Sequence, residues 1–259
     1  MFWRIDMHEQ ITPLLLTFDE LPNLPRALAK LAWAKRIVVV DSGSGDGTRE
    51  FLATQPNVEV YQRKFDNHAA QWNYGLSATA IDTAWVLCLD ADYVLSDALV
   101  GELASLEPSL LTTGYFANFV YMLDGVPLRG SLYPPGVVLF RHGKALYRQT
   151  GHTQRLTLEG TPGQLAAPIF HDDRKPLTRW RASQRKYAAL EAAWLKARPW
   201  GSLRLTDRIR RVVVIAPWLV PMYTLLARGV ILDGKAGWRY AMQRGYAETL
   251  IARALLGFN

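Results

Sequence analysis

The amino-acid sequence predicts an α/β fold, in which a mostly parallel sheet is flanked by helices and followed by a helical, basic C-terminal extension. Three observations lead to this prediction. Short apolar runs alternate with helical patterns over the first ninety residues, two of these runs end in an aspartate, and basic residues gather after residue 174.

The elements of the first half follow in order along the chain. The apolar run 11–18 predicts a strand, and the leucines at 21, 24, 28 and 31 have the spacing of a helix. The β-branched run 36–40 predicts a second strand, which ends in a loop of turn-forming residues at 41–48. Residues 58–61 and 85–89 predict two more strands, with a helix at 69–78 between them. This β-α-β-α order favours parallel pairing, with helices covering the sheet.

The character of the chain changes after Leu99. Residues 114–121 and 137–140 predict strands, and Asp124-Gly125 predicts a hairpin turn. From Thr178 the chain reads as a helix, with Tyr187, Leu190 and Trp194 on one stripe. We therefore expect one domain at 1–175, composed of halves at 1–100 and 101–175, and a helical region at 176–259.

The charge of the chain is concentrated in its C-terminal part. The net charge is +7, and residues 174–211 contain twelve Lys or Arg against two acids. Such a segment predicts an anionic partner, and a membrane surface is one candidate. The uncharged run 212–227 is shorter than the roughly 20 residues that cross a bilayer. It predicts either burial in the core or a position in the membrane interface.

Composition and cysteine content restrict the compartment. The chain has 259 residues, 49% of them hydrophobic, which is enough for a full core. Its one cysteine, Cys88, lies in an apolar run, so that no disulfide forms within the chain. The first residues lack the basic start and the apolar core of a secretory signal. We expect a cytoplasmic protein.

Three carboxylates stand where chemistry is expected in such a sheet. Asp41 and Asp90 end predicted parallel strands, at the edge where open α/β sheets bind ligands. Asp90 and Asp92 are two residues apart, so on an extended segment their side chains point the same way. Carboxylates gathered in this way need a shared positive charge. Mn²⁺ or Mg²⁺, bound together with substrate phosphates, would supply it.

Several ordered motifs resemble a known family. They are Thr17-Phe18-Asp19-Glu20, then Val38-Val39-Val40-Asp41-Ser42-Gly43-Ser44-Gly45-Asp46-Gly47-Thr48, then Trp85-Val86-Leu87-Cys88-Leu89-Asp90-Ala91-Asp92. Their order resembles the signature of the family 2 glycosyltransferases, which have the Rossmann-like GT-A fold. Residues 232–237, with Tyr240 and Tyr246, are similar to the bacterial lipopolysaccharide-core glucosyltransferase branch.

The resemblance implies a nucleoside-diphosphate sugar as donor, with a UDP-linked sugar expected. It implies that Thr17, Glu20 and Asp41 surround the nucleoside. It places Asp90 and Asp92 around ribose, diphosphate and metal. Asp19 stands where relatives usually have asparagine. Further residues implied at the donor site are Asn73 in the helix before the Asp90 strand and His171 as an additional metal ligand. Independently of the family, a departing diphosphate needs positive charge beside it, and Arg174 and Lys175 are the nearest basic candidates.

The catalytic base is less clear from the sequence. Related chains commonly carry a carboxylate beside a histidine, where this chain reads Gly151-His152-Thr153-Gln154. His152 has an ordinary pKa suited to proton transfer near neutral pH. The alternatives are Asp172, Asp173 and Glu159.

The predicted function is an inverting, metal-dependent glycosyl transfer to a cell-envelope glycan or lipid-linked acceptor. We expect the protein at the inner face of the cytoplasmic membrane, with an anionic membrane surface as partner and no nucleic acid. One alternative is a nucleotidyltransferase, although residues 17–22 are acidic where a phosphate loop would be rich in glycine and lysine. Another is a basic membrane- or nucleic-acid-binding module with a vestigial donor site.

Overall fold

The computed structural model describes residues 6–150 and 153–258, which divide into two compact units. The first, here called the sheet unit, extends to residue 120 and includes residues 133–174. The second, the helical unit, consists of residues 121–132 and the chain from 175 onward. The predicted domain limit after residue 175 stays a prediction, but segment 121–132 groups with the helices.

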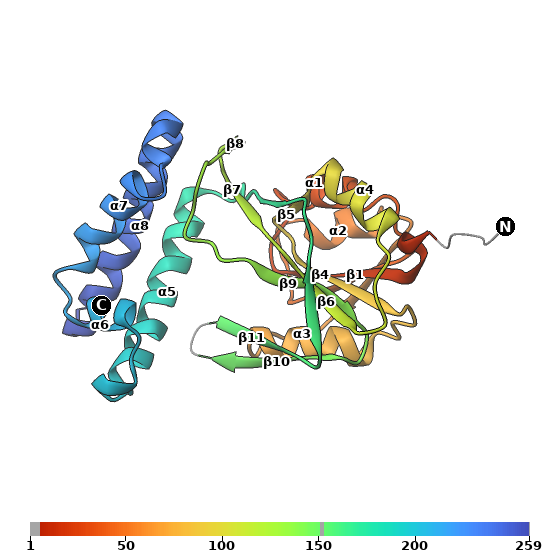
Figure 1. The fold of residues 1–259 in the computed structure, drawn as a ribbon, viewed down its shortest axis with the longest axis horizontal. Helices are drawn as coiled ribbons and strands as arrows, with labels where there is room; N and C mark the ends of the chain where they lie inside the picture. Colours follow the sequence, from red (N-terminus) through yellow and green to blue (C-terminus); the bar gives the residue numbers. More distant parts are fainter. Residues whose placement is uncertain (1–5, 151–152, 259) are drawn as a thin grey trace. The chain divides into compact units, whose positions relative to one another are not determined.

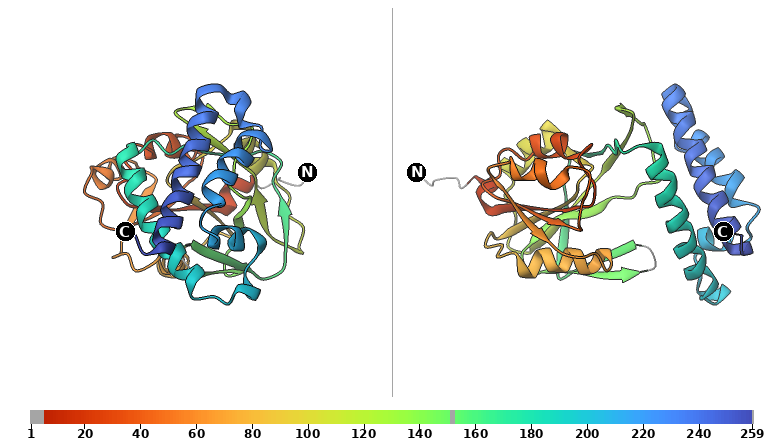
Figure 2. Two further views of the ribbon diagram at one scale, coloured as in Figure 1. Left: turned by 90° about the vertical axis from the view of Figure 1, so that its left-hand side faces the viewer. Right: turned by 180° about the vertical axis from the view of Figure 1, so that it is seen from behind.

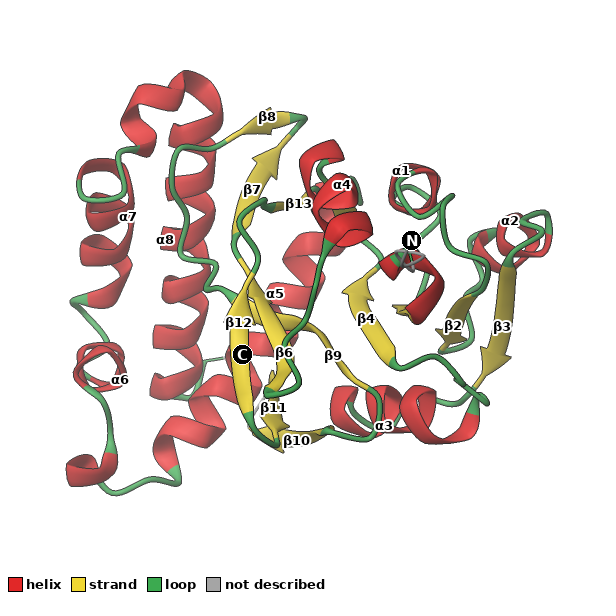
Figure 3. Cartoon of the chain, turned by 45° about the vertical axis from the view of Figure 1, so that its right-hand side comes forward, coloured by secondary structure: helices red, strands yellow, loops and turns green. Residues whose placement is uncertain are grey.

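A seven-stranded sheet forms the centre of the sheet unit (Figures 1 and 3). Its strand order is β12-β6-β9-β4-β1-β2-β3. Strands β4, β1, β2 and β3 run parallel, whereas β9 is antiparallel to both β4 and β6. The bounds are β1 Ile11–Thr17, β2 Ile37–Asp41, β3 Val58–Gln62, β4 Trp85–Asp90, β6 Thr112–Ala117, β9 Gly136–Arg141 and β12 Thr161–Gln164. The predicted mostly parallel α/β fold is confirmed.

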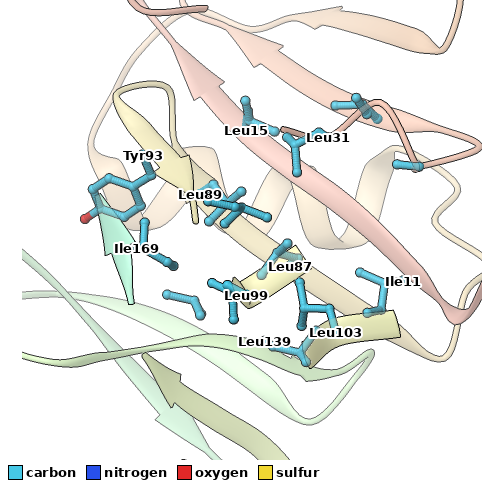
Figure 4. Close-up of a cluster of buried hydrophobic side chains, with 14 of the residues drawn as sticks. Ile11, Leu15, Leu31, Leu87, Leu89, Tyr93, Leu99, Leu103, Leu139 and Ile169 are labelled. Atoms are coloured by element: carbon cyan, nitrogen blue, oxygen red, sulfur yellow. The ribbon is translucent and has the colours of Figure 1, made fainter. Parts of the chain in front are cut away.

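Helices cover both faces of this sheet, because its central strands are apolar on both sides. On one face Leu87 and Leu89 of β4 pack near Leu99 and Leu103 (Figure 4). On the other face Cys88 is buried in a cluster with Trp72, and burial raises the pKa of its thiol. The helices are α1 Leu24–Ala29, α2 Thr48–Ala53, α3 His68–Ala78 and α4 Asp97–Ser105, and the short 3-10 helix η1 Met7–Gln10 precedes β1.

The single strand predicted at 114–121 is two strands in the structure. Strand β6 ends at Ala117, and β7 Phe119–Leu123 follows. Asn118 lies between them, and its carbonyl accepts a hydrogen bond from Ile169 N at 2.9 Å. The chain thus leaves the large sheet at this point. The remaining strands are β5 Tyr93–Leu95, β8 Val126–Pro127, β10 Ala145–Thr150, β11 Thr153–Leu158 and β13 Ile169–His171.

The helical unit contains long helices, of which α5 and α7 each pack against α8 (Figure 2). Their bounds are α5 Leu177–Lys196, α6 Leu205–Arg211, α7 Ala216–Leu226 and α8 Gly234–Leu256, with 3-10 helices η2 Trp200–Ser202 and η3 Val230–Asp233. The predicted hairpin turn is present between β7 and β8, where Asp124 and Gly125 have φ of 52° and 83°. Among residues 6–150 and 153–258, no helix has the length and hydrophobicity of a membrane span.

The stripe of Tyr187, Leu190 and Trp194 predicted on α5 is not the buried face of this helix. Tyr187 and Leu190 are exposed, whereas Ala188, Ala192 and Leu195 are buried. Two of the three buried residues are alanines, whose small side chains let neighbouring helices approach closely. Tyr187 and Leu190 therefore remain on the exposed side of α5.

Candidate functional site

The two predicted strand-end aspartates lie at one edge of the sheet, on opposite sides of β1. Asp41 is the last residue of β2 and pairs with Thr17, and Asp90 is the last residue of β4 and pairs with Leu16. Adjacent strands are spaced by roughly 4.8 Å, so the two backbones are about 10 Å apart. The candidate site therefore has two ends, one at Asp41 and the other at Asp90.

Asp41 is fully buried, and its carboxylate organises the loop that follows it. Oδ1 accepts hydrogen bonds from Gly43 N at 3.0 Å and Ser44 N at 2.9 Å. Oδ2 accepts from Thr17 Oγ1 at 2.9 Å and from the Ser44 hydroxyl. Four donors thus compensate the burial of this charge, which needs no cation shared with Asp90.

The loop after β1 is interlocked with the loop after β2. Asp19 N donates to Ser44 Oγ at 2.8 Å, and Gly45 N donates to the Asp19 carboxylate at 2.8 Å. Glu20 N donates to Thr48 Oγ1 at 2.8 Å. Asp19 has a φ of 52°, in the left-handed region that Asp and Asn adopt more readily than most residues. An acid therefore fits at this position as well as the amide usual in relatives.

Asp46 strengthens the same pair of loops. Its carboxylate accepts from Thr48 N at 3.0 Å, from Thr48 Oγ1 at 2.6 Å and from Leu21 N at 3.2 Å. Partial burial raises the pKa of Asp46, but the hydrogen bonds outweigh this effect and lower the pKa below its ordinary value. The sequence analysis did not single out this residue.

Asp92 and His171 are in contact at the other end of the site. His171 Nε2 lies 3.2 Å from Asp92 Oδ2, and both side chains are mostly buried. The pairing of β13 with β5 sets His171 opposite Tyr93, and Asp172 N donates to the Asp92 carbonyl at 2.9 Å. Burial by itself lowers the pKa of His171, but the Asp92 carboxylate outweighs it and raises the pKa.

An aromatic group that the sequence analysis missed surrounds His171. The rings of Tyr133 and Tyr93 lie 4.5 Å and 5.5 Å from the His171 ring, measured between centroids. The Phe119 ring is 5.1 Å from that of Tyr133, and the hydroxyl groups of Tyr93 and Tyr133 are hydrogen-bonded. Aromatic faces are suited to stacking on sugars. The signal in the sequence was weak, because these residues come from three separate segments.

The predicted metal ligands were Asp90, Asp92 and His171, with Asp41 expected in the same cleft. Within residues 6–150 and 153–258, no group of three His, Cys, Asp or Glu side chains is arranged to hold a metal ion. The carboxylate and imidazole of Asp92 and His171 nevertheless suit Mn²⁺ by donor type, with Asp90 two residues away. Hard cations often take one or two protein carboxylates and complete their coordination with substrate phosphates. The residues present fit a metal that binds together with the donor.

Asn23 is the buried centre of a hydrogen-bond network that the sequence analysis also missed. Its Nδ2 donates to Glu20 Oε2 at 2.8 Å and to Asp173 Oδ1 at 3.0 Å. Its Oδ1 accepts from Arg174 N at 2.7 Å and from the Arg26 guanidinium at 3.1 Å. One amide therefore joins the loop after β1 to the segment after β13.

The two candidate bases after β13 lie in different surroundings. Asp172 is buried, with its carboxylate between Arg174 Nε at 2.6 Å and Arg26 Nε at 3.3 Å. Two guanidinium groups occupy both of its oxygens, which favours a structural role. Asp173 is half-buried and bonded to Asn23.

The other candidates are placed as follows. Glu159 is exposed, and its carboxylate lies 3.5 Å from Lys144 Nζ. His152 lies outside the described residues. Lys175 belongs to the helical unit, so its predicted contact with the donor stays a prediction.

Asn73 binds the backbone of a neighbouring strand. Its Nδ2 donates to the Tyr147 carbonyl at 2.9 Å, and its Oδ1 accepts from Tyr147 N at 3.0 Å. The side chain thereby attaches α3 to β10. These contacts indicate a structural role, and the predicted nucleotide contact stays a prediction.

Comparisons with known proteins bear on the first part of this site. Residues 14–107 match the family model described as glycosyl transferase family 2. This segment contains Asp41, Asp90 and Asp92, and it ends before His171. A search of curated proteins finds no match.

Solved structures of S. aureus TarS are similar at a low level. Residues 1–349 of TarS in complex with UDP-GlcNAc have 13% identity and a TM-score of 0.49, with 96% of this chain and 91% of that chain covered. The complex with UDP has the same identity and TM-score, with 96% and 92% covered. A likeness of this degree carries no argument about function.

Proposed function

From the premise that this chain carries a family 2 glycosyltransferase domain in residues 14–107, we propose that it is an inverting, metal-dependent enzyme. Its donor is a nucleoside-diphosphate sugar, and its acceptor is a cell-envelope glycan or a lipid-linked saccharide. The donor base lies near Thr17, Glu20 and Asp41. The diphosphate lies near Asp90 and Asp92.

One observation carries the proposal: the contact of 3.2 Å between Asp92 and His171, at the end of the site opposite Asp41. It brings an imidazole to the second aspartate of the motif. When bound, a divalent cation would neutralise negative charge that develops on the departing diphosphate. Arg174 supplies a further positive group in the same unit, held by Asp172 and Asn23.

The acceptor hydroxyl must lose a proton as its oxygen attacks the anomeric carbon. Of the two described carboxylates after β13, Asp173 is better suited to take this proton. It is half-buried, and it accepts a hydrogen bond from the neutral amide of Asn23. Asp172 is instead enclosed by the guanidinium groups of Arg26 and Arg174, which favours a structural role.

The donor chemistry is tested by hydrolysis of a panel of nucleotide sugars with Mn²⁺, Mg²⁺ or a chelator. We expect one donor to be consumed with metal, and Asp92→Ala to reduce the rate by about 100-fold. Asp97→Asn is the matched control, because this carboxylate is 88% exposed and lies five residues further on, paired with Lys30. Full activity of Asp92→Ala would refute the metal role.

The base is tested separately with Asp173→Asn and Asp172→Asn, through the pH dependence of kcat. Loss of the acidic limb of the profile in Asp173→Asn alone supports the assignment. If Asp173→Asn keeps that limb and His152→Ala loses it, the base is His152.

The acceptor class implies a site of action. We propose that the enzyme works peripherally at the inner face of the cytoplasmic membrane, where envelope glycans are assembled on lipids. The basic segment 174–211 supports this location, because twelve Lys or Arg against two acids attract an anionic lipid surface. Binding to anionic vesicles at low salt, lost at high salt, is the expected behaviour.

A further inference from the structure

Helix α7 has one face packed inside the helical unit. Ala216, Thr224 and Leu225 are buried. On the side of α8, a Cβ at Gly245 would lie only 3.0 Å from Pro221 Cγ and 3.4 Å from the Pro217 carbonyl. The two prolines and the small residues thus allow close packing. The orientation of α7 about its own axis is fixed by this contact.

The remaining large side chains of α7 point outward. Trp218 is 77% exposed, Met222 52% and Leu226 61%, and these residues are four apart on one face. Leu219 and Tyr223 beside them are also exposed. No charged residue occurs from 212 to 227. A helix that faces water normally presents polar side chains there, and a large exposed apolar patch marks a binding surface.

The patch continues on both sides of the helix. Before α7, Val214 is 70% exposed and Ile215 46%, and after it Leu232 is 70% exposed. All of these residues belong to the helical unit. These exposed apolar residues lie on consecutive segments of the chain, whereas single exposed leucines scattered over a surface are ordinary.

Basic residues border the patch. Between 204 and 239 there are seven Lys or Arg against two acids, and one of these acids, Asp233, is paired with Arg129. Two of the basic residues, Arg210 and Arg239, are themselves paired with Glu248 and Asp124. The guanidinium groups of Arg211 and Arg228 donate to the carbonyls of Arg198 and Ser131, which leaves their positive charge in place. If this face packed against the same face of a second copy, the arginines of the two copies would lie close together and their positive charges would repel. An anionic surface matches the border in charge.

Tryptophan and tyrosine beside methionine and leucine are typical of helices that lie in the membrane–water interface. With eleven residues, α7 is too short to cross a bilayer. We propose that α7, with segments 212–215 and 231–232, is the element that inserts into the interface of an anionic bilayer. The arginines at its ends contact the lipid headgroups. This inference rests on the proposed function for its setting, but its test uses no catalysis.

The test is cosedimentation of the full chain with vesicles of phosphatidylcholine, with and without phosphatidylglycerol. We expect binding to the anionic vesicles to be weakened ~10-fold or more by W218S/M222S, since the apolar area available for insertion is lost. The matched control is L110S/L111S, which removes two leucines that are 94% and 82% exposed in the sheet unit. Its binding should stay within about twofold of wild type.

Three results would overturn the proposal. In the first, the wild-type chain does not bind anionic vesicles. In the second, W218S/M222S binds these vesicles as tightly as wild type. In the third, vesicle binding is unchanged and the wild-type chain is a dimer in solution, whereas W218S/M222S is a monomer. The last result would show that a second copy covers the patch. Nucleotide-sugar hydrolysis in vesicle-free buffer should be equal in all three proteins. Loss of vesicle binding with retained hydrolysis therefore separates this inference from the transferase activity.

Discussion

The strongest structural prediction concerns Asn23, whose buried amide holds together two segments 150 residues apart. Asn23→Ala removes four hydrogen bonds, three of them to the charged side chains of Glu20, Asp173 and Arg26. At about 1 kcal/mol each, they amount to about 4 kcal/mol, and solvent access to the partly exposed partners reduces this to about 3 kcal/mol. We expect the free energy of unfolding of the sheet unit to fall by that amount.

Cys88 provides the assay, because it is the one cysteine of the chain and is buried in the sheet unit. Labelling of its thiol at increasing urea concentration reports the opening of this unit. The matched control is Asn57→Ala, since Asn57 makes one side-chain hydrogen bond, to the Ala34 carbonyl at 2.9 Å. This control should lose only about 1 kcal/mol.

Asn23→Asp tests the sign of the interaction. It places a third carboxylate against Glu20 and Asp173, so we expect it to be at least as unstable as the alanine variant. If Asn23→Ala lost no more stability than Asn57→Ala, or if Asn23→Asp matched wild type, the network would not carry the energy assigned to it.

Four further predictions follow from the same structure. Tyr133→Phe should cost about 1 kcal/mol of stability, because it loses the hydroxyl bond to Tyr93, whereas Tyr133→Ala should also raise the KM for the donor. His171→Gln should raise the Mn²⁺ concentration that gives half-maximal activity by roughly 10-fold, measured by metal titration. Because the pKa of Asp46 is lowered in the folded chain, its stabilisation is present at neutral pH and is lost as the pH falls through that lowered value. Asp46→Asn should therefore be less stable than wild type at neutral pH and equal to it in strong acid, measured by urea unfolding. Cys88 should resist thiol reagents in the native chain and react on unfolding, since burial raises the pKa of its thiol.

Local pattern in the sequence predicted the strands that end in Asp41 and Asp90. The β-branched and apolar runs 37–40 and 85–89 are buried strands on both faces of the sheet, as their composition predicts. Parallel strands set their carboxyl ends at one edge, so the sequence predicted that Asp41 and Asp90 lie at the same edge of the sheet. The turn at Asp124-Gly125 was also predictable, since positive φ at both residues suits this pair.

The sequence does not show how distant segments pair, although the family resemblance implied that His171 and Asp92 hold the same metal. His171 meets Asp92 because β13 pairs with β5, and the register of that pairing depends on the whole small sheet. Asp172 and Asp173 are neighbours in sequence, yet one lies between two arginines and the other is bonded to Asn23. Adjacent side chains on extended backbone point to opposite sides, and only the packing decides which side is buried.

The helical unit shows the same division. The sequence shows that the run 212–227 contains no charged residue. This composition fits burial in the core and a position in the membrane interface equally well. The tertiary structure shows which side chains are buried, because the small residues and prolines of α7 pack against α8 and leave Trp218 and Met222 exposed. A sequence determines which residues avoid water. Which of them find a partner within the chain depends on the shape of the neighbouring helix, and a single chain's periodicity does not contain that information.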